Sequence, residues 1–267
     1  MPMLALFQYQ FMINAFLAGM MIALLASFSG AFVVLRRYAL LTETLAHAAL
    51  VGVAVGILTQ SHPSWMAVAA ALVSAWVIEY LRSFFHLYSD AVLAIFLSGS
   101  LAVAIIIVSL AGAFNSSLFS YLFGSILSVS TTEVWTIFIV GIPALFLLAY
   151  FYKELYFVAF DEEVAKASGI PVTLLNFMLV SIVAVIIALS IRIVGTLLVG
   201  ALMVIPTVAA LRYRLGFSAT VALSVLFGLF SVMAGMMLSY TFSLPSGATI
   251  VLCVLLIFVV SLLINRR

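Results

Sequence analysis

Long apolar runs, separated by short groups of polar and turn-forming residues, dominate the sequence. No side chain is charged between Leu215 and Asn265, and several runs exceed the ~20 residues that a helix needs to cross a membrane. The interruptions predict nine spans, over Phe11–Leu35, Ala39–Thr59, Pro63–Leu81, Ala91–Ala113, Val134–Tyr152, Val172–Leu189, Ile193–Leu211, Phe217–Tyr240 and Gly247–Ile264. The pattern predicts an all-α polytopic membrane protein, with residues 1–267 as a single transmembrane domain in the lipid bilayer.

Composition excludes several classes of function. Only 7% of the residues are charged and 67% are hydrophobic, so the chain lacks the polar surface of a water-soluble domain, in which about 25% of residues are charged. The only cysteine, Cys253, cannot form an intramolecular disulfide. The sequence has no GxxxxGK[ST] phosphate-binding loop and no nucleophile arrangement. We therefore expect no catalytic residues, no permanently bound cofactor, no ATP hydrolysis by this chain and no nucleic-acid partner.

The positions of the cations predict the orientation in the membrane. With Arg36 and Arg37 in the cytoplasm, alternating crossings leave only Arg192 outside among ten Lys and Arg residues. This asymmetry is typical of membrane proteins, whose cytoplasmic loops are rich in Lys and Arg. It predicts an external N-terminus and a cytoplasmic C-terminus. A Ser- and Gly-rich stretch at residues 116–130 is expected to be interfacial or re-entrant instead of spanning.

The longest polar segment, residues 153–171, is predicted to be cytoplasmic and to contain a short helix over Glu162–Ser168. Asp161 is a suitable N-cap, and the carboxylates that follow it suit the positive end of the helix dipole. Gly169 fits the position after the helix, where the backbone turns left-handed. This helix is either a simple loop element or a docking element for a cytosolic protein.

Two ionisable residues lie within the second predicted span. Glu43 and His47 are four residues apart, which puts them on one helix face. A charge near the bilayer centre costs at least ~2.5–3.5 kcal/mol, so such groups usually face a bundle interior or a wet cavity. A carboxylate and an imidazole suit Zn²⁺ or Mn²⁺. The alternative is a hydrogen-bonded pair that joins two helices. A metal site would also need water, other helices or a second copy of the chain.

Other residues in the spans are assigned structural roles. Gly52 and Gly56 follow the small-xxx-small rule, which lets their helix approach a neighbour closely. Glu79 and Arg82 are predicted to form an (i, i+3) pair. Glu133 is expected to cap a helix or be solvated at the outer face. His62 is expected to be a solvated loop residue, and His86, on the cytoplasmic side, is expected to have no special role.

Five motifs, in order along nearly the whole chain, resemble the zinc/manganese ABC importer permeases of the ABC-3 family. They are GAFVVLRRYALLTETLAHAALVGVAVG (Gly30–Gly56), YLFGSILSVS (Tyr121–Ser130), DEEVAKASGI (Asp161–Ile170), VGTLLVGALMVIPTVAA (Val194–Ala210) and LPSGATIVL (Leu244–Leu252). The second and last resemble the high-affinity zinc branch. Two departures stand out: Glu43 replaces the family's Asp, and Ser125 stands where many relatives have an acidic residue.

The resemblance implies a type II ABC importer permease fold with eight to nine spans, working as a homodimer. It also implies a cytosolic ATPase subunit, an extracytoplasmic metal-binding protein, and a location in the bacterial inner membrane. ATP would act only through the partner. The family's metal-coordinating positions fall on Glu43 and His47, and its ATPase-docking helix falls on the segment that contains Asp161, Glu162, Glu163, Ala165 and Gly169.

The sequence therefore predicts the permease subunit of an ABC transporter that imports a divalent metal ion, zinc first and then manganese or iron(II). One rival is an ion-coupled secondary transporter in which Glu43 and His47 relay protons. The other is a membrane scaffold that transports nothing.

Overall fold

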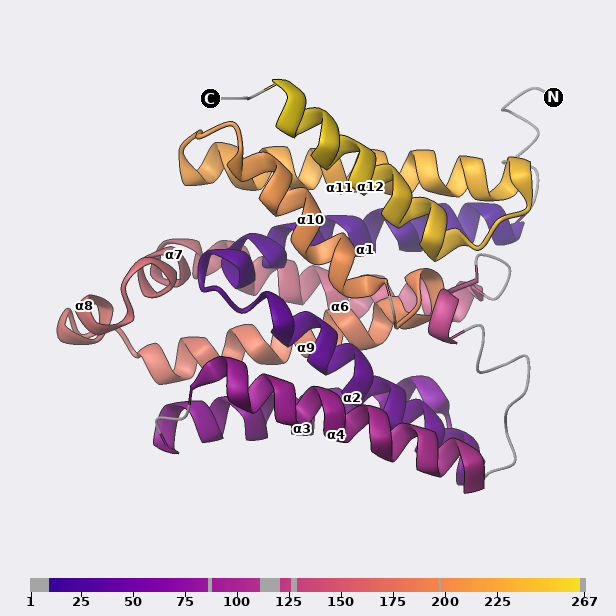
Figure 1. Ribbon diagram of the computed structural model, residues 1–267, viewed down its shortest axis with the longest axis horizontal. Helices are drawn as coiled ribbons and strands as arrows, with labels where there is room; N and C mark the ends of the chain where they lie inside the picture. The colour runs from indigo at the N-terminus through magenta and orange to yellow at the C-terminus, as the bar shows by residue number, and fades with distance from the viewer. Residues whose placement is uncertain (1–9, 86–87, 111–120, 126–128, 197, 265–267) are drawn as a thin grey trace. The chain divides into compact units, whose positions relative to one another are not determined.

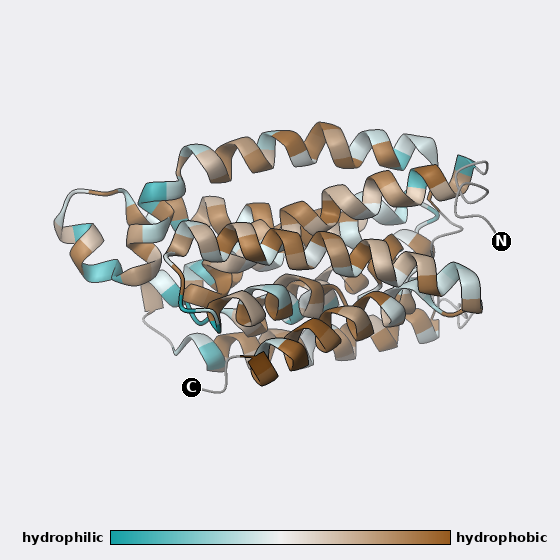
Figure 2. Cartoon of the chain, turned by 90° about the horizontal axis from the view of Figure 1, so that it is seen from above, coloured by the Kyte–Doolittle hydropathy of each residue, from teal (hydrophilic) through white to brown (hydrophobic). Residues whose placement is uncertain are grey.

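Helices make up all the regular secondary structure in the part of the chain that the computed structural model describes, residues 10–85, 88–110, 121–125, 129–196 and 198–264 (Figure 1). The helices are α1 (Gln10–Leu35), α2 (Ala39–Leu58), α3 (Pro63–Phe85), α4 (Ser89–Leu110), α6 (Thr131–Tyr150), α7 (Tyr152–Phe160), α8 (Glu162–Ala167), α9 (Val172–Val194), α10 (Val199–Leu211), α11 (Phe217–Phe242) and α12 (Ser246–Ile264). Figure 2 shows hydrophobic residues along most of the length of these helices.

Eight of these helices are long and apolar enough to cross a membrane, which confirms the predicted all-α membrane fold. The predicted span over Ile193–Leu211 was wrong in its first half, because α9 continues through Val194 and α10 begins only at Val199. Gly195 causes the break, since its φ of +91° ends the helix. The 13 residues of α10 extend about 20 Å at 1.5 Å per residue, less than the hydrocarbon thickness of about 30 Å.

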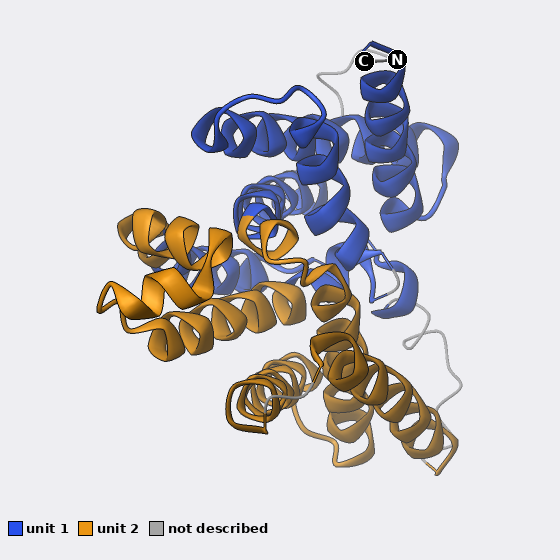
Figure 3. Ribbon diagram, turned by 60° about the vertical axis from the view of Figure 1, so that its left-hand side comes forward, with its two compact units in different colours: residues 1–31, 119–145, 190–267 blue, residues 32–118, 146–189 orange. Residues whose placement is uncertain are grey.

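The chain forms two compact units, which Figure 3 shows in different colours. Unit 1 contains residues 1–31, 119–145 and 190–267, and unit 2 contains residues 32–118 and 146–189. Helices α1, α6 and α9 run from one unit into the other. The single transmembrane domain stays a prediction.

Glycine contacts between main chains organise unit 1. Gly124 and Gly195 both have positive φ angles, +74° and +91°, and each lies against the other's chain segment. The Thr196 N–H donates to the Tyr121 carbonyl at 2.9 Å, and the Ser125 N–H donates to the Arg192 carbonyl at 2.9 Å. The described residues at 121–125 therefore pack on the break between α9 and α10. The rest of the predicted interfacial segment, 116–120 and 126–128, lies outside the described residues.

In unit 2, helix α2 packs closely on α3 and α4. A Cβ atom added to Gly52 would lie 2.7 Å from the Ala67 Cα atom of α3, and one added to Gly56 would lie 2.7 Å from the Pro63 Cα atom. The two glycines therefore allow main-chain contact between α2 and α3, as the small-xxx-small spacing predicts. Most of α2 is buried, whereas most residues of α3 and α4 are partly or fully exposed.

The short helix α8 forms where the sequence predicts it, with Ser168 as its C-cap instead of its last residue. The Asp161 carboxylate accepts the N–H groups of Glu163 at 3.1 Å and Val164 at 3.0 Å, and so caps the first turn. At the other end Gly169 has a φ of +82°, and the Ile170 N–H donates to the Ala165 carbonyl at 3.2 Å. This is the left-handed termination that glycine favours.

Replacing Gly52 with alanine is expected to destabilise unit 2, because the added methyl group would overlap the main chain of α3. Overpacking of this kind costs about 1–3 kcal/mol. Gly99 of α4 is a matched control, since a Cβ atom there meets nothing within 4 Å and alanine favours the helix by up to about 1 kcal/mol. The measurement is the thermal unfolding of the detergent-solubilised variants. Equal melting temperatures for Gly52→Ala and Gly99→Ala would contradict the close contact.

Replacing Gly169 with alanine is expected to loosen α8, because a left-handed backbone costs a residue with a Cβ atom about 1–2 kcal/mol. Gly216 is the control, since its surroundings are equally open but its φ is −58°. Hydrogen exchange of the α8 amides should speed up about tenfold in Gly169→Ala, the factor that corresponds to about 1.4 kcal/mol, and stay unchanged in Gly216→Ala. Unchanged exchange in both variants would show that α8 does not depend on this termination.

Candidate functional site

Helix α2 presents the two predicted metal ligands in different environments. Glu43 is exposed, whereas His47, one turn further along, is buried with 6% of its surface exposed. The helix begins at Ala39, so His47 lies about 12 Å along an axis of about 30 Å at 1.5 Å per residue. The structure therefore places an accessible carboxylate one helical turn before an enclosed imidazole.

The Nδ1 atom of His47 is buried and has no hydrogen-bond partner among the described residues. Leaving a buried polar atom unpaired costs about 1–3 kcal/mol, so such atoms are uncommon unless another species meets them. A neutral imidazole offers a nitrogen lone pair to a metal ion or a proton. The ring therefore has a buried nitrogen that is free to coordinate.

The surroundings of α2 hold this helix face in place. The Thr44 hydroxyl lies between the two ligand positions; it donates to the Leu40 carbonyl at 2.8 Å and to the Leu93 carbonyl of α4 at 3.3 Å. Gly52 holds the same helix against α3. The packing therefore fixes the part of α2 that carries His47 from both sides.

The described residues contain no group of three or more His, Cys, Asp or Glu side chains that could hold a metal ion. A groove of about 600 Å³ between α2, α3 and α4 is almost entirely apolar, and neither Glu43 nor His47 lines it. Glu43 and His47 thus supply two donors of one oxygen and one nitrogen. Two donors alone suit transient coordination of an ion better than a closed structural site, which has four ligands.

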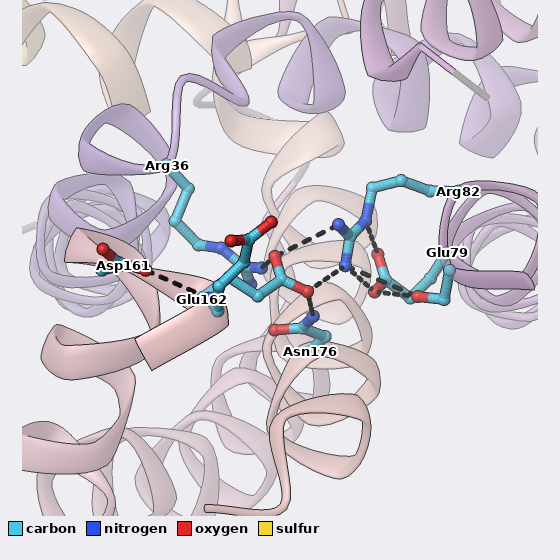
Figure 4. Close-up of polar contacts among 8 residues, drawn as sticks. Arg36, Glu79, Arg82, Asp161, Glu162 and Asn176 are labelled. Carbon is cyan, nitrogen blue, oxygen red and sulfur yellow. Dashed lines mark hydrogen bonds and ion pairs between the residues drawn. The ribbon is translucent and has the colours of Figure 1, made fainter. Parts of the chain in front are cut away.

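A cluster of charged residues surrounds the start of α8 in unit 2 (Figure 4). The Glu162 carboxylate accepts hydrogen bonds from Arg36, in the turn after α1, at 3.2 Å, from Arg82 of α3 at 3.2 and 3.3 Å, and from Asn176 of α9 at 3.2 Å. Arg82 also binds Glu79 at 2.6 Å, which confirms the predicted pair. We call these five side chains the α8 cluster.

The two arginines of the α8 cluster keep Glu162 ionised. Burial by itself would raise the pKa of Glu162, but Arg82 and Arg36 together hold it below its usual value. Tyr38 lies beside both arginines, with its ring 5.1 Å from the Arg36 guanidinium and 5.5 Å from that of Arg82. Burial raises the pKa of the Tyr38 hydroxyl, against the opposing effect of the same two arginines. At neutral pH the tyrosine is neutral and Glu162 is charged.

Sequence reasoning missed most of the α8 cluster. Arg36 is 126 residues from Glu162 in the chain, and Arg82 is 80 residues from it. In the sequence, Arg36 served only as a marker of the cytoplasmic side, and Arg82 was assigned Glu79 as its only partner. The one available signal was Asn176, an amide one turn inside a largely apolar helix that begins just after the α8 segment.

A second ion pair lies at the other end of α9, in unit 1. Glu133 accepts hydrogen bonds from the Ser130 N–H at 2.9 Å and the Ser130 hydroxyl at 3.0 Å, and it pairs with Arg192. The expected capping role of Glu133 is therefore correct. The ion pair gives Arg192, the one cation predicted to lie outside, a specific partner.

The predicted docking residues of α8 differ in accessibility. Glu163 and Gly169 are exposed, and so is Asp161, whose carboxylate is occupied by capping. Ala165 is fully buried, so it holds α8 against the rest of unit 2. The exposed face also includes Val164, which leaves 49% of its surface accessible. A partner could contact this face through Glu163 and Val164.

Comparison with known proteins gives relatives that align with almost the whole chain. A probable metal transport system membrane protein of Treponema pallidum is 37% identical over 95% of both chains. The high-affinity zinc uptake system membrane protein ZnuB of Haemophilus influenzae is 31% identical and covers 97% of this chain and 99% of its own. The manganese import system permease protein ScaB of Streptococcus gordonii is 30% identical over 98% of this chain and 94% of its own.

Among solved structures, PsaBC from Streptococcus pneumoniae in complex with Fab contains a chain with a TM-score of 0.86 and 30% identity. The match covers 97% of this chain and 93% of that one, so the fold is that of an ABC metal-transporter permease. The family model described as the ABC 3 transport family matches residues 8–265. The chain belongs to the ABC 3 transport family.

Proposed function

We propose that this chain is the membrane permease subunit of a bacterial ABC transporter that imports a divalent metal ion. The observation that carries the proposal is the buried His47 imidazole, whose Nδ1 atom is unpaired among the described residues, one turn from the exposed Glu43 carboxylate. Membership of the ABC 3 family supports it, as do relatives named for zinc and manganese transport.

The arrangement of the two donors suits a step in ion passage. An exposed carboxylate attracts a hydrated cation and can replace some of its water, and the buried imidazole then adds a nitrogen ligand. Because only two donors are present on α2, the ion keeps exchangeable ligands and can leave again. ATP-driven alternating access would open this pair to one side of the membrane at a time.

Zinc is the ion that we propose first. Imidazole nitrogen is a common zinc ligand, and a carboxylate oxygen completes many zinc sites, but the same pair accepts manganese and iron(II). Glutamate at position 43 reaches one methylene further than the aspartate expected from the family. The ion is therefore substrate in this proposal, and no metal belongs permanently to the chain.

The proposal requires partners that supply energy and cargo. A cytosolic ATPase subunit would contact α8 through its exposed face, and an extracytoplasmic metal-binding protein would deliver the ion at the opposite side. This places α8 in the cytoplasm of a multi-pass inner-membrane protein, with an external N-terminus and a cytoplasmic C-terminus. The homodimer expected from the resemblance stays a prediction, and a second copy would be one source of further ligands.

The rival reading is a secondary transporter in which Glu43 and His47 relay protons. That reading predicts uptake by the chain alone, driven by an ion gradient, and gives the capped helix α8 no role. Family membership favours the ABC mechanism. Uptake that requires ATP and the ATPase subunit would distinguish the ABC mechanism from the secondary transporter.

Removing either proposed ligand is expected to abolish most metal uptake. In proteoliposomes that contain the complete transporter, Glu43→Gln and His47→Ala should each lower ⁶⁵Zn²⁺ or Mn²⁺ uptake at least tenfold, as is usual when a metal loses a ligand or its support. His62→Ala is the histidine control, since His62 is exposed. Glu43→Asp keeps the carboxylate and should retain most uptake. Wild-type rates in both Glu43→Gln and His47→Ala would exclude these residues as ligands.

Reversing the charge of Glu163 is expected to weaken binding of the ATPase subunit. Glu163 is exposed on α8, and a like charge placed at an interface costs affinity, here about tenfold. The measurement is the amount of ATPase subunit that co-purifies with the tagged permease as ionic strength rises. Asp90→Lys, at an exposed carboxylate in the first turn of α4, is the control. Equal co-purification of Glu163→Lys and Asp90→Lys would leave α8 as a loop helix only.

A further inference from the structure

We propose that Glu162 is a positioning residue that fastens α8 to the membrane-embedded helices of unit 2, and not a contact for the ATPase. This inference rests on the proposed function, because it assigns the route by which movement of α8 reaches the ligands on α2. The α8 cluster of Arg36, Glu79, Arg82, Glu162 and Asn176 carries it (Figure 4).

The Glu162 side chain leaves 41% of its surface exposed, but both of its carboxylate oxygens accept hydrogen bonds from within the chain. Oε2 accepts Arg36 and one nitrogen of Arg82, each at 3.2 Å. Oε1 accepts the second Arg82 nitrogen at 3.3 Å and the Asn176 amide at 3.2 Å. Four donors from three other elements therefore converge on one side chain at the first residue of α8, which leaves it little capacity for a partner protein.

The charges in the α8 cluster balance only while α8 is in place. Arg36 and Arg82 are offset by Glu79 and Glu162, and Glu79 is 1% exposed. The Arg36 side chain is 4% exposed, and Glu162 is its only ion-pair partner in the described part of the chain. If α8 moved away alone, a buried guanidinium would lose its counter-charge, which is strongly unfavourable. The ends of α1 and α3 are therefore expected to move together with α8.

The same cluster lies next to the start of α2. Tyr38 precedes Ala39, the first residue of α2, and its buried ring contacts both Arg36 and Arg82. Glu43 follows five residues later and His47 nine residues later on the same helix. A rigid connection therefore runs from α8 through Glu162, the two arginines and Tyr38 to the helix that carries the proposed ligands.

The experiment uses the complete transporter and measures two quantities separately: how much ATPase subunit binds, and how many metal ions are transported per ATP. E162Q should keep the amount of co-purified ATPase subunit and its rate of ATP hydrolysis, but lower the number of metal ions transported per ATP about tenfold, the factor expected for one lost charged hydrogen bond. R36Q removes the arginine partner in the same ion pair and should have the same effect. The double variant should be no worse than either single variant, because both remove one shared contact. D90N, an exposed carboxylate in the first turn of α4, should behave as wild type.

Three results would overturn the proposal. A monodisperse E162Q permease that no longer retains the ATPase subunit would make Glu162 a docking contact. An unchanged number of ions per ATP would show that the cluster transmits nothing. Multiplied losses in the double variant would mean that Arg36 and Glu162 act independently. If E162Q aggregates, R36Q gives the same comparison.

A second measurement does not depend on transport. Hydrogen exchange of the α8 amides in the purified permease should accelerate about tenfold in E162Q and R36Q, again the factor for one charged hydrogen bond, and stay unchanged in D90N. Unchanged exchange in E162Q would show that Glu162 does not fasten α8. A wild-type complex without ATP-dependent uptake would refute the proposed function, while the exchange result would still decide whether Glu162 holds α8.

Discussion

The lack of water in the hydrocarbon core is the constraint on which this structure depends. A charged or polar group there must find a partner within the protein, because hydration cannot stabilise it. The pairs Glu79–Arg82, Glu162–Arg36 and Glu133–Arg192 lie at helix ends and meet a similar requirement, since each charge has a specific counter-charge. His47 does not, since its buried Nδ1 has no partner among the described residues. Arg36 and Asn176 also each keep one buried polar atom unpaired among the described residues, but both side chains hydrogen-bond to Glu162. The unpaired nitrogen of His47 is the observation on which its proposed role as a ligand rests.

Close helix packing and polar pairing both hold the helices together. Without a hydrophobic driving force between helices in lipid, association depends on van der Waals contact and interhelical hydrogen bonds. Gly52 allows close van der Waals contact between α2 and α3, and Thr44 makes a hydrogen bond between α2 and α4. Together they hold the helix that carries Glu43 and His47. If α2 is rigid, the proposed ligands can move only when another element moves the whole helix. The α8 cluster connects α2 to such an element, α8.

The parts of the fold that follow local rules could be predicted from the sequence. The Asp161 cap, the Gly169 termination and the Glu79–Arg82 pair each depend on residues within a few positions of one another. The break at Gly195 was missed because the apolar pattern continues through it, and only the contact with Leu122 and Gly124 shows why the chain turns there. The partners of Glu162 were missed because no spacing rule connects residues 80 or 126 positions apart.

The opposite accessibilities of Glu43 and His47 bear on how an ion could be released as well as bound. A site with four protein ligands would hold zinc tightly, and release would then need a large change in geometry. With one accessible carboxylate and one buried imidazole, a small displacement of α2 alters how many protein donors reach the ion. The Tyr38 ring at the start of this helix contacts Arg36 and Arg82, and both arginines bind Glu162 of α8. A shift of α8 by a partner would therefore be passed to α2 and change that number. In the mechanism that we propose, the sparse ligand set and the ion-paired helix act together, because weak coordination makes a modest movement sufficient.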